Sequence, residues 1–307
     1  MELLFLGTGS GVPAKERNTQ SMALKMLNER NEVWLFDCGE ATQHQILKTS
    51  LKPRKISKIF ITHMHGDHIY GLAGFLSSRS FQGGDESLTI YGPKGIKNFV
   101  MTNLKLSQTH LSYFIHFIEL DQESGQLFED EQLLVSYALL DHGIPCYGFR
   151  IEEKSKPGTL LVDKLREDQV PSGPIYGRLK KGESVQLDDG RIIHGKDYIG
   201  EPIEGCIVTI LSDTKPCPSR EKLADQADLL VHESTFSAKE ADLAKAYNHS
   251  TSLDAARLAE KVNAKKLLLT HISSRYVGRL AKQLEEEART VFPNTQVVHD
   301  FFEIEIN

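Results

Sequence analysis

The chain has 307 residues, enough for one large domain or two small ones with a buried core. Charged residues make up 25% and hydrophobic residues 40% of the sequence, which excludes a disordered chain and is typical of a soluble globular protein. The formal net charge of −6 lacks the basic excess of most nucleic-acid binders, so the whole-chain charge argues against that class.

The sequence shows no sign of a membrane or secretory segment. No apolar stretch approaches the roughly 20 residues that a transmembrane helix needs, and the first residues lack the basic and apolar parts of a signal peptide. The four cysteines, at positions 38, 146, 206 and 217, are scattered and form no C-x-x-C pair, which favours free thiols in a reducing compartment. We therefore expect a cytoplasmic protein without a membrane anchor.

Six short apolar segments along the chain each end in Asp or His. They are 33–36 before Asp37, 59–62 before His63, 133–140 before Asp141 and His142, 207–212 before Asp213, 229–231 before His232, and 267–270 before His271. Continuous apolar runs predict strands buried on both faces, so helices must cover the sheets. Two such helices are predicted near the end: one follows a capping box of Thr251 and Asp254, and one spans 280–288. The pattern predicts an α/β protein with polar side chains gathered at strand ends.

The segment HMHGDH at 63–68 carries three imidazoles and a carboxylate directly after a predicted strand. His63 and His65 are expected to point the same way, whereas Asp67 and His68 project toward a neighbouring position. Imidazole and carboxylate ligands suit zinc, and two adjacent half-sites are the arrangement of two-metal hydrolysis. Because this segment cannot fill two coordination spheres, we expect further ligands at the other strand ends: His142, His271 and Asp213, which is able to bridge both ions.

The H-x-H-x-D-H motif, with Asp37 upstream and later strand-end ligands, resembles the metallo-β-lactamase superfamily. The resemblance implies an α/β fold, the αβ/βα four-layer sandwich, with two Zn²⁺ per chain at one edge. Carried over by position, one zinc takes His63, His65, His142 and Asp213, and the other takes Asp67, His68, Asp213 and His271. Asp37 is implied to orient a ligand without binding metal, and an ordinary turn residue is the alternative.

Further segments resemble the ribonuclease Z family of that superfamily. In chain order they are PAKERN at 13–18, a Pro- and Gly-containing region from 155 to 197, HEST at 232–235, NHST at 248–251 and HISSRY at 271–276. The resemblance runs from residue 2 to about 302. Three positions depart from the family pattern: Ser234 stands in place of Ala, Ala73 stands where Pro is expected, and Ser212 precedes Asp213 where Gly is usual.

The resemblance implies a zinc-dependent endoribonuclease that cuts the 3′ trailer from precursor tRNA after the discriminator nucleotide. The tRNA keeps a 3′-hydroxyl, and the trailer carries a 5′-phosphate. As a hypothesis, Asp67 accepts or orients the proton of the attacking water, and His249, oriented by Glu233, protonates the leaving oxygen. The alternative for His249 is a structural position beside the helix cap at Thr251, and both roles are compatible. The family also implies a homodimer, which no feature of the sequence shows by itself.

Residues 155–197 interrupt the strand pattern, and the resemblance implies that they form a protruding tRNA-binding arm inserted in a domain of residues 1–307. Segment 154–197 holds nine Lys or Arg against seven Asp or Glu, a local net charge of +2. Asp189 and Gly190 predict a hairpin between 185–187 and 191–193. From composition alone, a solvated loop is the alternative. The expected RNA contacts are Lys15, Arg17, Arg178, Lys180, Lys181 and Arg275.

Two other functions stay open from the sequence. A small-molecule phosphodiesterase of the same superfamily shares the metal motif but needs no arm. A non-catalytic zinc protein that only binds RNA or protein needs no proton donor, so the pair of Glu233 and His249 argues against it. Two bound zinc ions add +4 to the net charge of −6. RNA is therefore expected at the zinc edge, the loop of Lys15 and Arg17, and the arm.

Overall fold

The computed structural model describes residues 1–306, which form two compact units. Unit 1 holds residues 1–128, 135–151 and the chain from 207 onward, and unit 2 holds Glu129–Leu134 and Glu152–Cys206. Within the described residues, no helix has the length and apolar character needed to cross a bilayer.

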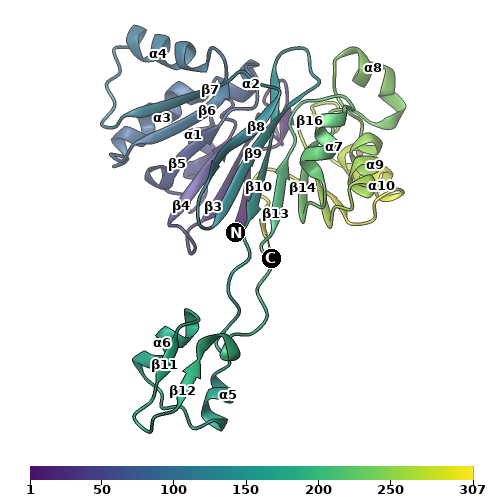
Figure 1. Cartoon of the computed structure of the whole chain (residues 1–307). Coiled ribbons are helices and arrows are strands. Elements are labelled where there is room, and N and C mark those ends of the chain that lie inside the picture. Colours follow the sequence, from purple (N-terminus) through teal and green to yellow (C-terminus); the bar gives the residue numbers. More distant parts are fainter. Residues whose placement is uncertain (307) are drawn as a thin grey trace. The chain divides into compact units, whose positions relative to one another are not determined.

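Unit 1 contains two seven-stranded sheets, of which the first comes mainly from the amino-terminal half (Figure 1). In spatial order its strands are β18 (Glu303–Glu305), β1 (Glu2–Gly7), β3 (Ser21–Met26), β4 (Glu32–Phe36), β5 (Ile56–Phe60), β6 (Leu88–Pro93) and β7 (Ile115–Leu120). Strands β4 to β7 run parallel to one another, so their carboxyl ends lie along one edge.

The second sheet comes mainly from the carboxyl-terminal half. In spatial order its strands are β17 (Thr295–Val297), β15 (Lys266–Thr270), β14 (Leu229–Glu233), β13 (Ile207–Ile210), β10 (Cys146–Glu153), β9 (Leu133–Leu140) and β8 (Ser124–Glu129). Strands β13, β14, β15 and β17 are parallel neighbours. A short parallel pair, β2 (Gly9–Ser10) with β16 (Ile272–Ser273), lies outside both sheets.

Helices pack on the outer face of each sheet. Helices α1 (Thr42–Leu47), α3 (Leu72–Phe81) and α4 (Ile96–Leu106) share a hydrophobic core with the first sheet. Helices α7 (Pro218–Ala224), α9 (Ser252–Lys261) and α10 (Arg279–Arg289) share another with the second sheet. The remaining short helices of unit 1 are η1 (Pro53–Lys55), α2 (Gly66–Ile69), η3 (Ala238–Glu240) and α8 (Ala241–Ala246).

The apolar run in β4 shows why both faces of each sheet are covered. Val33 and Leu35 belong to the core beneath the helices, whereas Phe36 faces the opposite way and stacks on Phe60 of β5 with ring centroids 4.8 Å apart. Phe149 of β10 approaches Phe60 from the second sheet, with centroids 5.3 Å apart. Side chains alternate between faces along a strand, so a continuous apolar run joins two cores at once. The predicted helix–sheet–sheet–helix sandwich is confirmed.

The parallel strands bring the polar residues at their ends together. Asp37 follows β4 and His63 lies three residues beyond β5, while Asp213 follows β13 and His271 follows β15. Asp37 and His271 both adopt a left-handed backbone with φ of 56°, which turns the chain sharply at the strand end. The predicted strands at 59–62 and 207–212 end two residues early, at Phe60 and Ile210. His232, predicted to follow a strand, lies inside β14, because the strand extends to Glu233.

Unit 2 has a small core of its own. It contains α5 (Val162–Glu167), α6 (Pro174–Lys180), the hairpin of β11 (Ser184–Gln186) and β12 (Ile192–His194), and η2 (Gly195–Tyr198). Leu165, Leu179, Val185, Ile193 and Tyr198 are buried together. The predicted hairpin is confirmed, with each strand shifted by one residue, and the predicted arm of 155–197 lies within this unit.

Candidate metal centre

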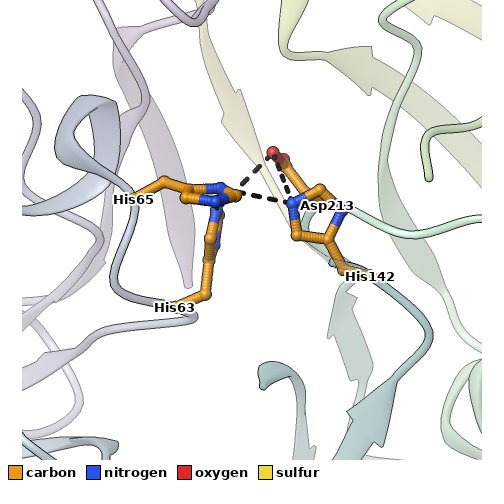
Figure 2. Close-up of side chains that lie close together, drawn as sticks. All are labelled: His63, His65, His142 and Asp213. Atoms are coloured by element: carbon orange, nitrogen blue, oxygen red, sulfur yellow. Dashed lines mark hydrogen bonds and ion pairs between the residues drawn. The ribbon is translucent and has the colours of Figure 1, made fainter. Parts of the chain in front are cut away.

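Four side chains of unit 1 converge from three loops at the carboxyl ends of the strands (Figure 2). This first cluster is made of His63, His65, His142 and Asp213, with one ligand atom from each within 4.8 Å of the others. His65 Nδ1 lies 3.0 Å from His63 Nε2 and 3.3 Å from His142 Nε2. Two nitrogens bound to one tetrahedral zinc ion lie about 3.3 Å apart. The nitrogens are therefore spaced as ligands that share an ion.

A second cluster lies beside the first and consists of Asp67, His68 and His271. The two imidazole Nε2 atoms are 3.3 Å apart. Asp67 Oδ2 lies 3.4 Å from His271 Nε2 and 3.5 Å from His68 Nε2. These separations again match ligands around one ion.

Asp213 faces both clusters. Its Oδ2 lies 3.7 Å from His63 Nε2 in the first cluster and 3.7 Å from His68 Nε2 in the second. Its Oδ1 is buried, makes no hydrogen bond among residues 1–306 and lies 3.3 Å from His271 Nδ1. A buried carboxylate that is not fully hydrogen-bonded is costly unless a cation compensates its charge. The paired clusters thus fit a dinuclear metal site, with Asp213 between the two positions.

The protonation of the first cluster suits metal binding. Burial, reinforced by the charge of His68, holds the pKa of His63 well below its usual range. Burial and the neighbouring His142 lower the pKa of His65. Neutral imidazoles have a lone pair free for a metal ion.

The ring of His68 in the second cluster is oriented by Asp37, a buried carboxylate that belongs to neither cluster. Asp37 Oδ2 accepts a hydrogen bond of 2.7 Å from Nδ1 of His68. The Nε2 atom of His68 is then directed at the cluster. Burial alone lowers the pKa of His68, but Asp37 and Asp213 outweigh burial and raise it well above its usual value. His68 would therefore have to lose the proton on Nε2 before that nitrogen could hold a metal ion.

Glu233 and His249 lie beside the clusters. His249 Nδ1 donates to Glu233 Oε1 over 2.9 Å, and the same oxygen accepts the backbone N–H groups of Thr214 and Ser250. Glu233 Oε2 accepts the backbone N–H and the hydroxyl of Thr235. Five donors thus surround a fully buried carboxylate. They favour its charged form.

The charge of Glu233 controls the protonation of His249. Burial by itself lowers the pKa of His249, but the Glu233 charge and hydrogen bond outweigh it and raise the pKa to about 9. Burial also raises the pKa of Glu233, yet His249 brings it below its ordinary value. His249 therefore carries a proton near neutral pH, and Glu233 is ionised. His249 also groups with Asp213 and His271, but its Nδ1 is already occupied by Glu233.

The predicted capping box fixes the chain just after His249. The Thr251 hydroxyl accepts from the backbone N–H of Asp254, and the Asp254 carboxylate accepts from the backbone N–H of Thr251. This cap starts α9, so the preceding residues are held against Glu233 by the helix start. His249 therefore lies both next to the start of α9 and beside the metal clusters.

The basic residues predicted to contact RNA differ in their surroundings. In unit 1, Arg17 Nη1 donates to Thr8 Oγ1 over 2.7 Å and to the Val298 carbonyl over 2.6 Å. Arg275 pairs with Glu240 over 3.1 Å. Lys15 is exposed at the rim of a 190 Å³ cavity formed by residues 9–17 and 272–277.

In unit 2, Arg178 pairs with Glu183 over 2.8 Å, while Lys180 and Lys181 are exposed. The RNA-binding role of all six basic residues stays a prediction. Of these side chains, Arg17 is the most engaged inside its own unit, with desolvation lowering the pKa of its guanidinium.

Several polar residues around the clusters were not predicted from the sequence. Thr62 and Thr235 each contact a metal-cluster histidine, and Ser212 contacts Thr62. Thr214 and Ser250 supply backbone donors to Glu233. The one available signal was position, because each of the five residues is within two positions of a predicted site residue.

A metallo-β-lactamase sandwich with paired His and Asp clusters at one edge defines a metal-dependent hydrolase. Comparison with known proteins narrows this class. The chain is 62% identical to the Ribonuclease Z of Pediococcus pentosaceus over 306 residues, covering 100% of this chain and 99% of that protein. It resembles the crystal structure of the short form of human tRNase Z with a TM-score of 0.72 and 31% identity, covering all of both chains. The chain belongs to the ribonuclease Z family and is an endoribonuclease.

Two further matches concern the fold and the amino-terminal half. The metallo-β-lactamase fold protein YhfI from Bacillus subtilis has a TM-score of 0.68 at 20% identity, covering 99% of this chain and 98% of that one, which supports the fold alone. Residues 1–156 match the family described as Anti-Pycsar protein Apyc1. That match includes the H-x-H-x-D-H motif but ends before Asp213, Glu233, His249 and His271, whereas the ribonuclease Z relative covers them all.

Proposed function

We propose that the protein removes the 3′ trailer from precursor tRNA after the discriminator nucleotide, with two Zn²⁺ per chain. The tRNA product keeps a 3′-hydroxyl and the trailer has a 5′-phosphate. The observation that carries this proposal is the proton-holding pair of Glu233 and His249, 2.9 Å apart, beside two clusters spaced for metal ligands. A binding protein has no use for such a proton donor.

The residues at the two clusters are proposed to hold the ions as follows. One ion would be held by His63, His65, His142 and Asp213, and the other by Asp67, His68, His271 and Asp213. When bound, the ions activate water as a nucleophile and neutralise charge on the scissile phosphate. Imidazole and carboxylate ligands at tetrahedral spacing favour zinc.

The remaining steps belong to the side chains of the protein. Burial raises the pKa of Asp67, but His271 and His68 outweigh it and keep the carboxylate ionised, so Asp67 accepts or orients a proton at the nucleophile. His249 donates its proton to the leaving 3′-oxygen from Nε2, since Nδ1 is held by Glu233. Asp37 fixes the ring of His68 throughout.

We propose that unit 2 contains the tRNA-binding arm, residues 155–197, inserted in a metallo-β-lactamase-like domain that spans 1–307. The arm contacts phosphates through Arg178, Lys180 and Lys181, and Lys15, Arg17 and Arg275 contribute in unit 1. Lysines 180 and 181 support this role because their ammonium groups are exposed.

The arm also separates this function from a small-molecule phosphodiesterase. The backbones of Lys156 and Ile203 pair through two hydrogen bonds of 2.9 Å, so a short Gly-Ser turn can replace residues 157–202. The shortened protein is expected to lose tRNA cleavage and to keep hydrolysis of bis-p-nitrophenyl phosphate. Unchanged cleavage of precursor tRNA by the shortened protein would contradict the proposed role of the arm.

We propose that the protein acts as a homodimer in the cytoplasm. Large apolar side chains stay exposed in and near α3, α4 and β7: Phe81, Met101, Leu106, Phe114 and Ile118. An apolar surface of this kind favours association with a second copy. None of the four cysteines, all within the described residues, forms a disulfide, which suits a reducing compartment. Sedimentation of the wild type and of Phe114→Ser tests the dimer, because the variant is expected to shift toward monomer.

A further inference from the structure

Two threonine hydroxyls occupy equivalent places around the two clusters. Thr62 lies between the Asp37 carboxylate and His63, and Thr235 lies between the Glu233 carboxylate and His271. Both hydroxyls contact the Nδ1 atom of their histidine, and the Nε2 atom of each ring faces its cluster. His271 Nδ1 also lies 3.3 Å from Asp213 Oδ1. The hydrogen-bonding capacity of a hydroxyl then determines which nitrogen of each ring carries the proton.

Thr62 Oγ1 has one hydrogen to donate and two lone pairs. Its neighbours are the Asp37 carboxylate oxygens at 2.9 and 3.0 Å, Ser212 Oγ at 3.0 Å and His63 Nδ1 at 3.0 Å. The carboxylate only accepts, so it takes the hydroxyl hydrogen. Thr62 can then only accept from His63, whose Nδ1 must carry a hydrogen. Nε2 of His63 is left with its lone pair facing the first cluster.

The same count of hydrogens and lone pairs applies to the Thr235 hydroxyl. Its Oγ1 lies 2.7 Å from Glu233 Oε2 and 3.2 Å from the His271 carbonyl, and both are acceptors. Whichever of them takes the hydrogen, none remains for His271 Nδ1 at 2.9 Å, so that nitrogen must carry a hydrogen. Asp213 Oδ1, 3.3 Å from the same nitrogen, is a second acceptor for that hydrogen. His249 Nδ1 lies 3.3 Å from the Thr235 hydroxyl but donates to Glu233 over 2.9 Å. Nε2 of His271 is free and faces Asp67 and His68 in the second cluster.

Each buried carboxylate therefore acts on two rings. Asp37 contacts His68 directly and reaches His63 through Thr62, so it serves one ring in each cluster. Glu233 contacts His249 directly and reaches His271 through Thr235. The second arrangement joins a metal ligand to the proton donor through one carboxylate.

Ser212, which stands where the family usually has Gly, completes the first arrangement. Its hydroxyl donates to Thr62 Oγ1 over 3.0 Å and fills the second lone pair of that oxygen. One other group approaches the same His63 nitrogen, Cys146 Sγ at 3.7 Å, which is more distant than Thr62. The Thr62 hydroxyl thus has all three of its hydrogen-bonding positions occupied.

We propose that Thr62 and Thr235 are positioning residues whose hydroxyls fix the Nδ1–H tautomers of His63 and His271 and so leave Nε2 free for metal. The proposal rests on the metal site described under the proposed function. It concerns which ring nitrogen carries hydrogen, and this is measurable without metal or substrate. Ser212 restrains the Thr62 hydroxyl in this chain.

The test uses Thr→Val, which keeps the shape and removes the hydroxyl, and Thr→Ser, which keeps the hydroxyl. Long-range ¹⁵N–¹H spectra of the metal-free, full-length protein with ¹⁵N-labelled histidine report the tautomer of each ring. In the wild type, His63 and His271 are expected as Nδ1–H. Thr62→Val is expected to change the tautomer of His63 alone, and both Ser variants are expected to keep the wild-type pattern. Thr235→Val is expected to affect His271 alone and to change its tautomer only in part, because Asp213 Oδ1 at 3.3 Å still accepts from Nδ1.

Metal affinity gives a second readout. Competition with a chromophoric zinc chelator is expected to show a loss of about 10- to 100-fold for each Val variant. Each Ser variant is expected to stay within about threefold of wild type, on the same reasoning that the hydroxyl orients the ligand. The loss of zinc affinity in Ser212→Gly is expected to lie between those of the Ser and Val variants of Thr62. The tautomer of His271 is expected to stay unchanged in this variant.

The wild-type spectrum alone can overturn the proposal, even if a Val variant does not fold. Nε2–H tautomers at His63 and His271 would contradict it, as would Val variants with unchanged tautomers and unchanged zinc affinity. A wild-type protein that binds no zinc but shows the expected tautomers would instead contradict the proposed function, so the two failures are distinguishable.

Discussion

Replacing Glu233 by Gln removes the negative charge that keeps His249 protonated. Burial lowers the pKa of His249, and Glu233 is the largest influence that opposes it, giving a pKa of about 9 in place of 6.5. This rise corresponds to roughly 3 kcal/mol in favour of the protonated ring. Gln also places an amide N–H₂ among five donors that now face a carboxylate, and one unsatisfied buried donor costs about 1–3 kcal/mol.

The expected consequence is a shift in the pH dependence of cleavage. His249 must be protonated to donate, so activity falls as the pH rises through its pKa. In the wild type this alkaline limb of kcat is expected near the raised pKa of His249, about 9. In Glu233→Gln it is expected to move toward neutral pH by about 1–2 units, with a fall in kcat of up to about fourfold at pH 7.5 and of roughly 5- to 50-fold at pH 9.

Single-turnover cleavage of a precursor tRNA from pH 6 to 10 measures this shift. Glu286→Gln is the matched control, because Glu286 is exposed on α10, and zinc content by mass spectrometry is expected to be equal in all three proteins. An unchanged alkaline limb in Glu233→Gln, with zinc retained, would refute the assignment of His249 as the proton donor controlled by Glu233.

Three other predictions concern stability and RNA binding. Phe60→Ala, which removes a ring packed against Phe36 and Phe149, is expected to lower the free energy of unfolding by about 3–5 kcal/mol in urea titrations; a loss below 1 kcal/mol would contradict the two-sheet core. Thr251→Ala is expected to cost about 1 kcal/mol in the same assay through loss of the capping box, and an unchanged midpoint would argue against that cap. The double change of Lys180 and Lys181 to Ala is expected to raise KM for precursor tRNA several-fold and flatten its salt dependence without altering hydrolysis of a small diester, and an unchanged salt slope would exclude both from RNA binding.

The metal clusters were accessible from the sequence because their ligands follow strands. Parallel strands bring their carboxyl ends to one edge, so Asp213 and His271, far apart in the chain, are predicted to meet. The capping box at Thr251 and the hairpin around Asp189 were also accessible, since each depends on short-range spacing.

The hydroxyl contacts of Thr62 and Thr235 were not accessible in the same way. Threonine is common in strands, and nothing in its spacing shows that a hydroxyl lies between a carboxylate and an imidazole. The inward contacts of Arg17 with Thr8 and Val298 were equally hidden, because residues 17 and 298 meet only in the folded chain. A basic residue in a loop indicates available charge but not whether the fold already uses it.

The central claim is that the His and Asp clusters cut precursor tRNA at one position. End-mapping of the products from a 3′-extended, CCA-lacking precursor, incubated with zinc-loaded protein, tests it most directly. We expect a single cut after the discriminator nucleotide, with a 3′-hydroxyl on the tRNA and a 5′-phosphate on the trailer. His65→Ala is expected to abolish the cut, because it removes a ligand atom 3.0 Å from His63 Nε2. Scattered cleavage, or full activity in His65→Ala, would contradict the account.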